Sequence, residues 1–152
     1  MDLVEGNRTK APTVSQAARF AFLQSAASRN WLLQFGDIGT AFLNAPLAAR
    51  EKGAIYARQP QGGILGLGPR QLLKVTASVY GLNEAPLAWY ECFAEYLIGA
   101  GWTRSVLDPC LFMLRRRGTL VGQLIIHVDD CLCAGEGKEF EQAIRGLRER
   151  FE

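Results

Sequence analysis

Residues 123–134, QLIIHVDDCLCA, place two adjacent carboxylates between two apolar segments. Both flanking segments have strand character, so Asp129 and Asp130 lie where the chain turns between two strands. An Asp in a hairpin is ordinary turn chemistry, because its side chain hydrogen-bonds its own backbone. Two adjacent like charges are nevertheless unfavourable unless a cation neutralises them. The stretch predicts a β-hairpin and leaves two roles open for its acids, a structural turn or a metal site.

A second acidic strand end occurs far upstream, in residues 31–44, WLLQFGDIGTAFLN. A buried strand is predicted over 31–35, and it delivers Asp37 at its far end. In the strand predicted over 120–127, alternation puts His127 on the face that Asp129 would continue. If these two strands are neighbours, Asp37 and Asp129 meet across them. Three carboxylates converging on one sheet edge are how two-metal phosphoryl-transfer sites are built, and the spacing permits such a site without selecting it.

The remaining pattern alternates helices with short strands. Helices are predicted from Thr13 or Ser15 to about Ser28, from an N-cap at Asn83 to residue 98, and over 138–151. The apolar stripe of the last helix consists of Phe140, Ile144, Leu147 and Phe151. Further strands are predicted over 53–58, 71–76 and 111–114, with a loop over 61–69 that holds four glycines and a proline. This order predicts an α+β fold, an antiparallel sheet with helices packed on one face.

Length and composition bound the organisation of the chain. A chain of 152 residues suffices for one domain with a sizeable core, and we expect an irregular leader over 1–12 before a domain over 13–152. The net charge of +2 neither requires nor excludes a nucleic-acid partner. Four scattered cysteines and one histidine favour buried free thiols over a zinc site. No apolar run approaches the roughly 18 residues of a membrane span, and no signal-peptide layout is present. An intracellular chain, cytoplasmic or nuclear, not secreted and without a membrane partner, is therefore expected.

Six segments follow one another along the chain: APTVS at 11–15, DIGTAFLN at 37–44, IYARQP at 55–60, SVYGLNEAPLAWY at 78–90, DPCLF at 108–112 and HVDD at 127–130. Together they resemble the reverse transcriptase of copia-type LTR retrotransposons (Pseudoviridae), which carries APVV, DVKTAFLNG, IYMxQP, SLYGLKQAPRAWY, DPCLF and YVDD in this order. The resemblance is nearly collinear over residues 11–152. It implies an RNA-directed DNA polymerase and a palm-type sheet, a fragment of the fingers and palm.

The resemblance also assigns roles to single residues. Asp37, Asp129 and Asp130 match the catalytic carboxylates, which implies two Mg²⁺ (or Mn²⁺) ions. The implied partners are an RNA template, a DNA primer and deoxynucleoside triphosphates (dNTPs). His127 stands where the family has a primer-contacting tyrosine.

Five further residues match the nucleotide site of the family. Phe42 matches the aromatic that packs against the incoming sugar and rejects a ribose 2′-hydroxyl by its bulk. Ile38 and Gly39 would offer backbone N–H groups to the triphosphate, and Tyr80 and Gly81 would approach nucleotide and template. From the residues alone, core packing is the preferred interpretation for both aromatics, because large rings are mostly buried mass.

Other motif residues have structural interpretations. Core packing is expected for Trp89, Tyr90 and Cys110, a turn or helix-cap role for Asp108, and a solvated hairpin tip for the arginines at 115–117. The sequence departs from the family by an added Gly36, by Gly39 in place of a commoner polar residue, and by Asn83-Glu84 in place of a basic-polar pair.

The matched region lacks the upstream finger strands and the thumb that grip duplex, so we expect a palm-centred fragment with impaired synthesis. The alternative is a catalytically inert retrotransposon remnant that at most binds nucleic acid. Another palm-type nucleotidyl transferase, such as a cyclase, is disfavoured by the segment 78–90. The oligomeric state is left open.

Overall fold

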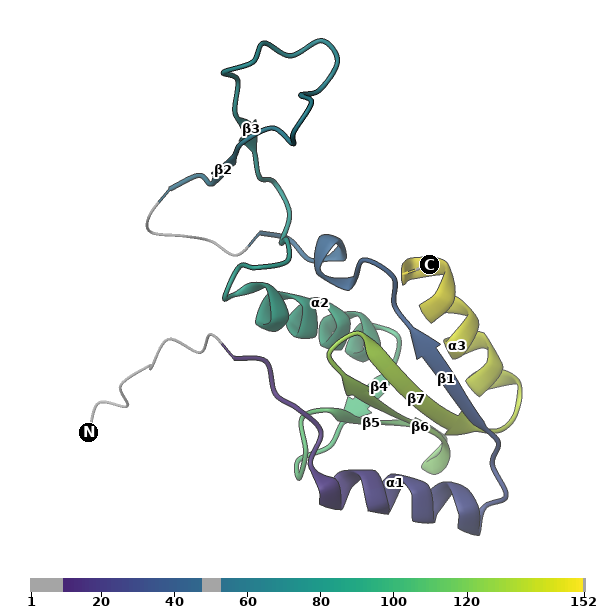
Figure 1. Ribbon diagram of the computed structural model, residues 1–152. Coiled ribbons are helices and arrows are strands. Elements are labelled where there is room, and N and C mark those ends of the chain that lie inside the picture. The colour runs from purple at the N-terminus through teal and green to yellow at the C-terminus, as the bar shows by residue number, and fades with distance from the viewer. Residues whose placement is uncertain (1–9, 48–52, 152) are drawn as a thin grey trace, which may run out of the picture.

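The computed structural model describes residues 10–47 and 53–151 (Figure 1). The helices are α1 (Gln16–Ser28), α2 (Ala85–Gly99) and α3 (Lys138–Phe151), with a short 3-10 helix η1 (Ala41–Asn44). The strands are β1 (Leu33–Asp37), β2 (Tyr56–Ala57), β3 (Leu73–Lys74), β4 (Trp102–Arg104), β5 (Leu111–Arg116), β6 (Thr119–His127) and β7 (Asp130–Gly135). The predicted leader lies outside the described residues up to residue 9.

Five of these strands form one antiparallel sheet in the order β1-β7-β6-β5-β4, and β2 pairs with β3 in a separate two-stranded sheet. The predicted α+β class is confirmed. Strand β4 was not predicted from the sequence, because three residues are too few to display a period. It extends the sheet by pairing with β5.

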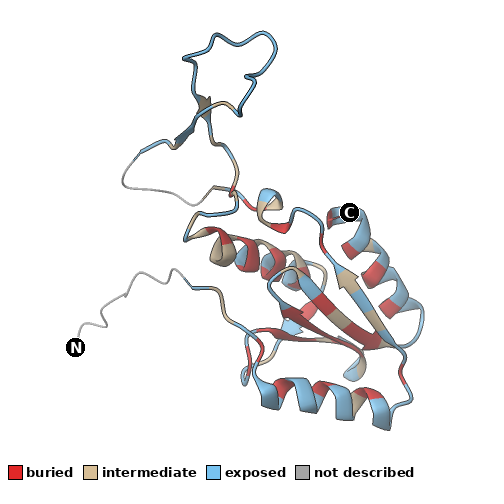
Figure 2. Cartoon of the chain, viewed as in Figure 1, coloured by how far each residue is buried: buried red, intermediate tan, exposed pale blue. Residues whose placement is uncertain are grey.

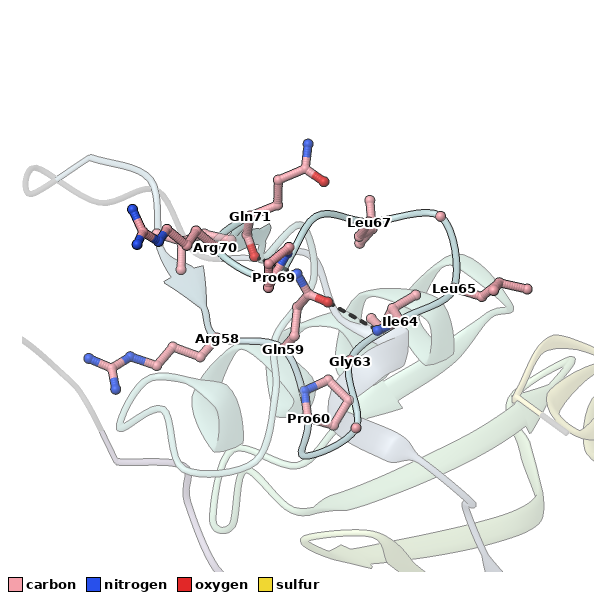
Figure 3. A pocket seen from close by; sticks show the side chains of 13 residues that line it. Arg58, Gln59, Pro60, Gly63, Ile64, Leu65, Leu67, Pro69, Arg70 and Gln71 are labelled. Carbon is pink, nitrogen blue, oxygen red and sulfur yellow. Dashed lines mark hydrogen bonds between the residues drawn. The ribbon is translucent and has the colours of Figure 1, made fainter.

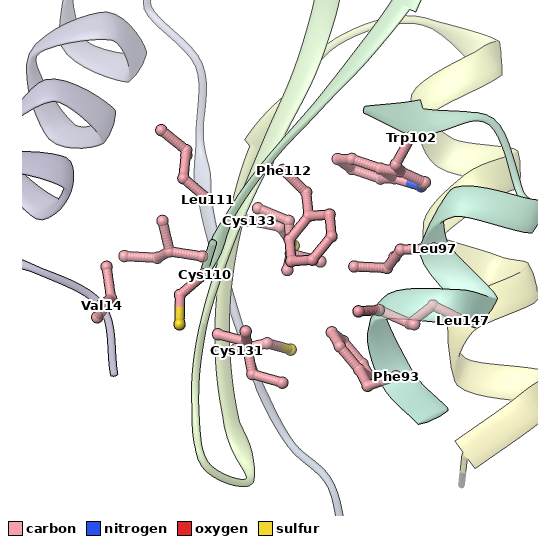
Figure 4. Packing of buried hydrophobic residues seen from close by; sticks show 14 of the residues in the cluster. Val14, Phe93, Leu97, Trp102, Cys110, Leu111, Phe112, Cys131, Cys133 and Leu147 are labelled. Atoms are coloured by element: carbon pink, nitrogen blue, oxygen red, sulfur yellow. The ribbon is translucent and has the colours of Figure 1, made fainter. Parts of the chain in front are cut away.

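The prediction that the helices pack on one face is wrong. Helix α1 lies against β6 on one side of the sheet, while α2 and α3 cover the other (Figures 1 and 4). Val14 and Leu111 point to the α1 side, and Phe112 and Leu97 meet on the opposite side. Residues 122–126 of β6 are buried without alternation, as in a strand whose two faces are both covered. Figure 2 shows the same burial across the central strands.

Helix α3 buries its predicted apolar stripe, and all four stripe residues are confirmed in the core. The ring centroid of Phe151 lies 5.3 Å from that of Trp89 and 5.5 Å from that of Phe93, so α3 and α2 meet through aromatic contacts.

Phe140, at the start of α3, lies over two glycines that face each other across β6 and β7. Gly122 and Gly135 are register partners, and a Cβ on either would stand 2.4 or 2.5 Å from the Phe140 ring. The missing side chains are therefore what lets α3 approach the sheet.

A buried carboxylate fastens the start of α1 to the loop before β5. Ser15, one of the two predicted cap residues, caps α1, and its Oγ accepts from the Ala18 N–H at 3.1 Å. Its own N–H donates to Asp108 Oδ2 at 2.9 Å, and the Cys110 N–H donates to Oδ1 at 2.8 Å. Burial by itself would raise the pKa of Asp108, but the hydrogen bonds from Ser15 and Cys110 outweigh it and lower that pKa below 3.8. The expected turn or cap role of Asp108 is confirmed.

Several predicted boundaries and one burial prediction differ from the structure. The strands predicted over 53–58, 71–76 and 111–114 are Tyr56–Ala57, Leu73–Lys74 and Leu111–Arg116. Strand β1 is an edge strand in which Leu33 and Phe35 are 51% and 66% exposed, so the prediction of a buried strand over 31–35 is wrong. The strand ends with Asp37 rather than before it. Helix α2 begins at Ala85 with Glu84 as its N-cap residue, one position later than the predicted cap.

Strands β2 and β3 and the loop between them form an arm that projects from the body (Figure 1) and is mostly exposed (Figure 2). Gln59 organises the loop, because its Nε2 donates to the carbonyls of Gly68 (2.7 Å) and Gln71 (2.9 Å) while its Oε1 accepts from the Ile64 N–H at 3.0 Å (Figure 3). The predicted loop over 61–69 is confirmed. A hollow of about 890 Å³ opens inside the loop, on the arm rather than beside the acids.

Among the helices of the described residues, none is long and apolar enough to cross a membrane.

Candidate active site

The two adjacent acids lie at a tight turn between β6 and β7. His127 and Asp130 are register partners, so only Val128 and Asp129 form the turn. Val128 has a φ of 61°, and Asp129 is not among the residues with positive φ. A positive φ at the first central residue alone is the type II′ pattern, which glycine normally occupies. A β-branched residue there stores backbone strain.

Strand β1 brings the distant acid beside this turn. Asp37 is the register partner of Asp130, and Asp130 is in turn the partner of His127. Directly opposed residues of antiparallel strands project from the same face. Asp37, Asp130 and His127 therefore form one row across three strands, here named the polar row, and all three are exposed.

This register corrects two expectations. The strand beside β1 is β7 and not β6, because a two-residue turn folds β7 back between them. The acid opposite Asp37 is therefore Asp130, and His127 shares its row with Asp130 rather than with Asp129. Asp129 lies in the turn, where its carbonyl accepts the Ile38 N–H at 3.1 Å.

Like charges directly opposite each other destabilise a sheet, so the Asp37–Asp130 pair favours a cation. Their carboxylate oxygens are the ligands that Mg²⁺ and Mn²⁺ prefer, and the donor chemistry fits the implied metal. Within the described residues, no three His, Cys, Asp or Glu side chains are gathered so that they could hold a metal ion. The fold thus supplies an opposed pair of carboxylates and a third acid in the adjoining turn, not a closed three-ligand group.

Behind the polar row, Cys131 fills the opposite face of β7. A Cβ on Gly36 would stand 2.9 Å from the Cys131 Sγ, so the glycine added before Asp37 leaves room for the sulfur. Burial raises the pKa of the Cys131 thiol to about 11, and the negative charge of Asp130 adds to the rise. The thiol is therefore protonated at neutral pH. It lines a cavity of about 210 Å³ between β1, β7 and α3.

The two aromatics expected near the nucleotide meet each other. The ring centroids of Phe42 and Tyr80 are 4.6 Å apart and their planes are tilted by 53°. Tyr80 is 62% exposed and Phe42 half-buried, so core packing does not describe Tyr80. Ser78, which is buried, anchors the segment through its Oγ, which donates to the Pro46 carbonyl at 2.9 Å. Gly81 follows with a φ of 91°, a conformation that glycine adopts without strain.

The backbone N–H groups of Ile38 and Gly39, both expected to bind a triphosphate, differ in their surroundings. The Ile38 N–H is already bonded to the Asp129 carbonyl, and Ile38 is buried. In this structure the N–H therefore extends the sheet, and its role toward a triphosphate stays a prediction. Gly39 is exposed, and a Cβ on it would meet no atom within 4 Å.

Trp89 and Tyr90 are buried, as expected, but each also makes a specific hydrogen bond. The indole N–H of Trp89 donates to the Val128 carbonyl at 2.6 Å, and the Tyr90 hydroxyl donates to the Pro109 carbonyl at 2.8 Å. Sequence reasoning missed the link from Trp89 to the acidic turn. The partners are 39 positions apart, and no local pattern signals a contact between a helix and a turn at that separation.

Comparison with known proteins places these features in a family. Residues 7–152 match the family described as "Reverse transcriptase (RNA-dependent DNA polymerase)". The chain is 31% identical over 144 residues to the "Retrovirus-related Pol polyprotein from transposon RE1" of Arabidopsis thaliana, covering 94% of this chain and 10% of that protein. It is 29% identical over 136 residues to the corresponding polyprotein "from transposon TNT 1-94" of Nicotiana tabacum, covering 90% of this chain and 10% of that protein.

The chain thus spans about a tenth of the length of these relatives. No solved structure matches it. The match over nearly the whole chain, together with the ordered motifs, settles the family. This chain belongs to the reverse transcriptase (RNA-dependent DNA polymerase) family, in the form found in copia-type Pol polyproteins of transposons.

Proposed function

We propose that the chain is the palm-centred part of an RNA-directed DNA polymerase. It would transfer a nucleotidyl group from a dNTP to the 3′-hydroxyl of a DNA primer paired with an RNA template. The observation that carries the proposal is the Asp37–Asp130 register pair, set beside the Val128-Asp129 turn. Two opposed, exposed carboxylates have no structural use that explains them in a sheet edge, and they match a site that binds divalent cations and phosphates.

Two Mg²⁺ or Mn²⁺ ions held by Asp37, Asp129 and Asp130 would supply the positive charge that activates the primer hydroxyl and offsets charge on the phosphates. In the transfer, the primer 3′-oxygen would bond to the α-phosphorus, the bond to the leaving pyrophosphate would break, and the hydroxyl proton would pass to solvent water. The chain itself positions the groups that react. His127, next to Asp130 in the polar row, is placed to contact the primer end.

The Phe42–Tyr80 pair would form a wall beside the incoming sugar. Because the two rings support each other at 4.6 Å, Phe42 cannot easily move aside for a ribose 2′-hydroxyl. Tyr80 and Gly81 remain exposed for contact with the nucleotide and template. Ile38 and Gly39, the two residues that follow Asp37, are the candidates for backbone donors to the triphosphate, and Gly39 stands in open space.

Primer extension on an RNA template with Mg²⁺ and dNTPs tests the proposal. The chain as given is compared with a longer form that carries the flanking Pol sequence. Each form is assayed both as the wild type and as the Asp130→Asn variant. Glu91→Gln serves as a control, because it removes the same charge from an exposed site on α2. Extension by the long form, lost in Asp130→Asn and kept in Glu91→Gln, is the expected result.

A long form that extends no primer with Mg²⁺, or with Mn²⁺ in its place, would refute the proposal. The chain would then be an inert retrotransposon remnant whose carboxylates record only its ancestry. Extension that survives Asp130→Asn would instead locate the chemistry elsewhere in the molecule.

A further inference from the structure

Trp89 connects helix α2 to the turn that carries the acids. Its indole Nε1–H donates to the Val128 carbonyl at 2.6 Å. The ring is 1% exposed and lies 5.4 Å from the ring of Phe93 and 5.3 Å from that of Phe151, centroid to centroid. The donor is therefore held in place by the core on the α2–α3 side of the sheet.

Burial alone does not explain this bond. The chain has three tryptophans, and in the described structure the indole nitrogens of Trp31 and Trp102 are buried without a hydrogen-bond partner. The fold thus tolerates unpaired indole N–H groups at two other core positions. The pairing at Trp89 is specific to the site that faces the turn.

The acceptor is the strained residue of the turn. Val128 adopts a φ of 61°, which a β-branched side chain takes only where its surroundings impose it. Two bonds impose it here: α2 holds the Val128 carbonyl through Trp89, and the residue after β1 holds the Asp129 carbonyl through the Ile38 N–H at 3.1 Å. Asp130 follows directly, opposite Asp37.

We propose that Trp89 is a positioning residue for the acidic turn. Its N–H holds Val128 at its positive φ and so fixes Asp129 and Asp130 relative to Asp37. The consequence for catalysis rests on the proposed polymerase function, whereas the coupling between α2 and the turn does not. Helix α2 then serves two parts of the site, because the Tyr80–Gly81 segment precedes it and Trp89 lies within it.

Amide hydrogen exchange tests the coupling directly. NMR on the ¹⁵N-labelled, metal-free chain follows the Ile38 amide, which reports the turn, against the amides of residues 119–125 in β6, which report the body of the sheet and are not paired with β4. In Trp89→Phe, the Ile38 amide should exchange about tenfold faster relative to these β6 amides, the loss expected for one hydrogen bond. In Trp102→Phe, which removes a buried indole without a partner, this ratio should not change.

Val128→Gly supplies the rescue. Glycine adopts a positive φ without strain, so a glycine at position 128 should keep the turn conformation without the hydrogen bond from Trp89. Trp89→Phe in the Val128→Gly background should therefore leave Ile38 exchange close to that of Val128→Gly alone. Equal exchange ratios in Trp89→Phe and Trp102→Phe would overturn the proposal, and so would a double variant as fast as Trp89→Phe. If Trp89→Phe does not fold, Val128→Gly must restore folding, and a double variant that stays unfolded also overturns the proposal.

Mn²⁺ binding measured by electron paramagnetic resonance separates the positioning role of Trp89 from the proposed polymerase function. Several-fold weaker binding in Trp89→Phe, but not in Trp102→Phe, is expected if the turn presents the acids to the ion. A wild-type chain that binds no Mn²⁺ would count against the proposed function, while the amide exchange would still decide the role of Trp89.

Discussion

Replacing Asp130 with asparagine should stabilise the fold while it removes the proposed activity. Asp37 and Asp130 stand directly opposite each other in adjacent antiparallel strands, and both are exposed. Neutralising one of them removes a like-charge contact and keeps the shape of the side chain. A residue that costs stability at a sheet edge is the pattern expected of a site retained for chemistry.

The size of the effect follows from the register. Side chains directly opposite in an antiparallel pair have Cβ atoms about 5 Å apart, and two unit charges at about 5 Å in water repel by about 0.8 kcal/mol. Like-charge pairs in sheets cost a similar amount, roughly 0.2–1 kcal/mol. For a chain of this length, about 1 kcal/mol shifts the melting temperature by roughly 2–4 °C. The melting temperature of Asp130→Asn in EDTA should therefore rise by about 1–4 °C.

Divalent cations should reverse the order of the two melting temperatures, so that the wild type becomes more stable than Asp130→Asn. A metal that binds only the folded chain, at ten times its dissociation constant, adds about 1.4 kcal/mol to the free energy of unfolding. Mg²⁺ should therefore raise the melting temperature of the wild type more than that of Asp130→Asn. Thermal unfolding followed by circular dichroism, with EDTA or with Mg²⁺, measures both effects, and Glu91→Gln controls for the change in net charge.

Two results would refute this reasoning. If Asp130→Asn is no more stable than Glu91→Gln in EDTA, the two carboxylates do not repel as the register requires. If Mg²⁺ stabilises Asp130→Asn as much as the wild type, the cation does not bind at the polar row.

Three further outcomes are expected. Gly135→Ala should lower the free energy of unfolding by about 1–3 kcal/mol in urea titration, because the new Cβ would stand 2.5 Å from the Phe140 ring; Gly99→Ala, with no atom within 4 Å, should be neutral or stabilising, and equal losses would contradict the packing. Asp108→Asn should cost about 1–3 kcal/mol at neutral pH. Folding lowers the pKa of Asp108 below 3.8, so the stability that its carboxylate contributes is present above that pH and is lost as the pH falls through the folded pKa. The free energies of unfolding of wild type and Asp108→Asn should therefore converge in urea titrations at acid pH. A difference that does not change with pH would contradict the role given to the Asp108 carboxylate. Phe42→Ala should raise ribonucleotide incorporation relative to deoxynucleotide incorporation in primer extension by an active long form, and an unchanged ratio would remove the residue from sugar selection.

Local patterns predicted the elements whose causes are local. The apolar stripe of α3 repeats at helical spacing, and this spacing needs no information from distant segments. The cap of α1 was narrowed to Thr13 or Ser15 because capping depends on the residues that follow it, and the structure selects Ser15. The order of the motifs identified the family, because each motif is a short contiguous segment that can be recognised in the sequence. These features were all predicted from the sequence and confirmed.

Features that depend on pairing between distant segments were not predicted. The neighbour of β1 depends on how the β6–β7 hairpin folds back, and a one-residue change in the turn moves every side chain to the other face. The helices on both faces were missed because an apolar run such as Leu124–Ile126 fits a strand covered on one side or on both. The bond from Trp89 to Val128 joins a helix to a turn, and composition carries no signal for it.

The pairing of β1 with β7 also decides when the site can exist during synthesis of the chain. The contact from the Cys133 Sγ to the Gln34 carbonyl joins residues 99 positions apart, and the polar row depends on the same strand pair. Closing so long a loop costs entropy before any contact is gained, which slows folding. On the ribosome, β1 must wait for nearly all of the described chain to emerge, and Leu33 and Phe35 stay unpaired at its edge until then. Conditions that slow translation between the two strands should therefore prolong the interval in which this edge can pair with another chain.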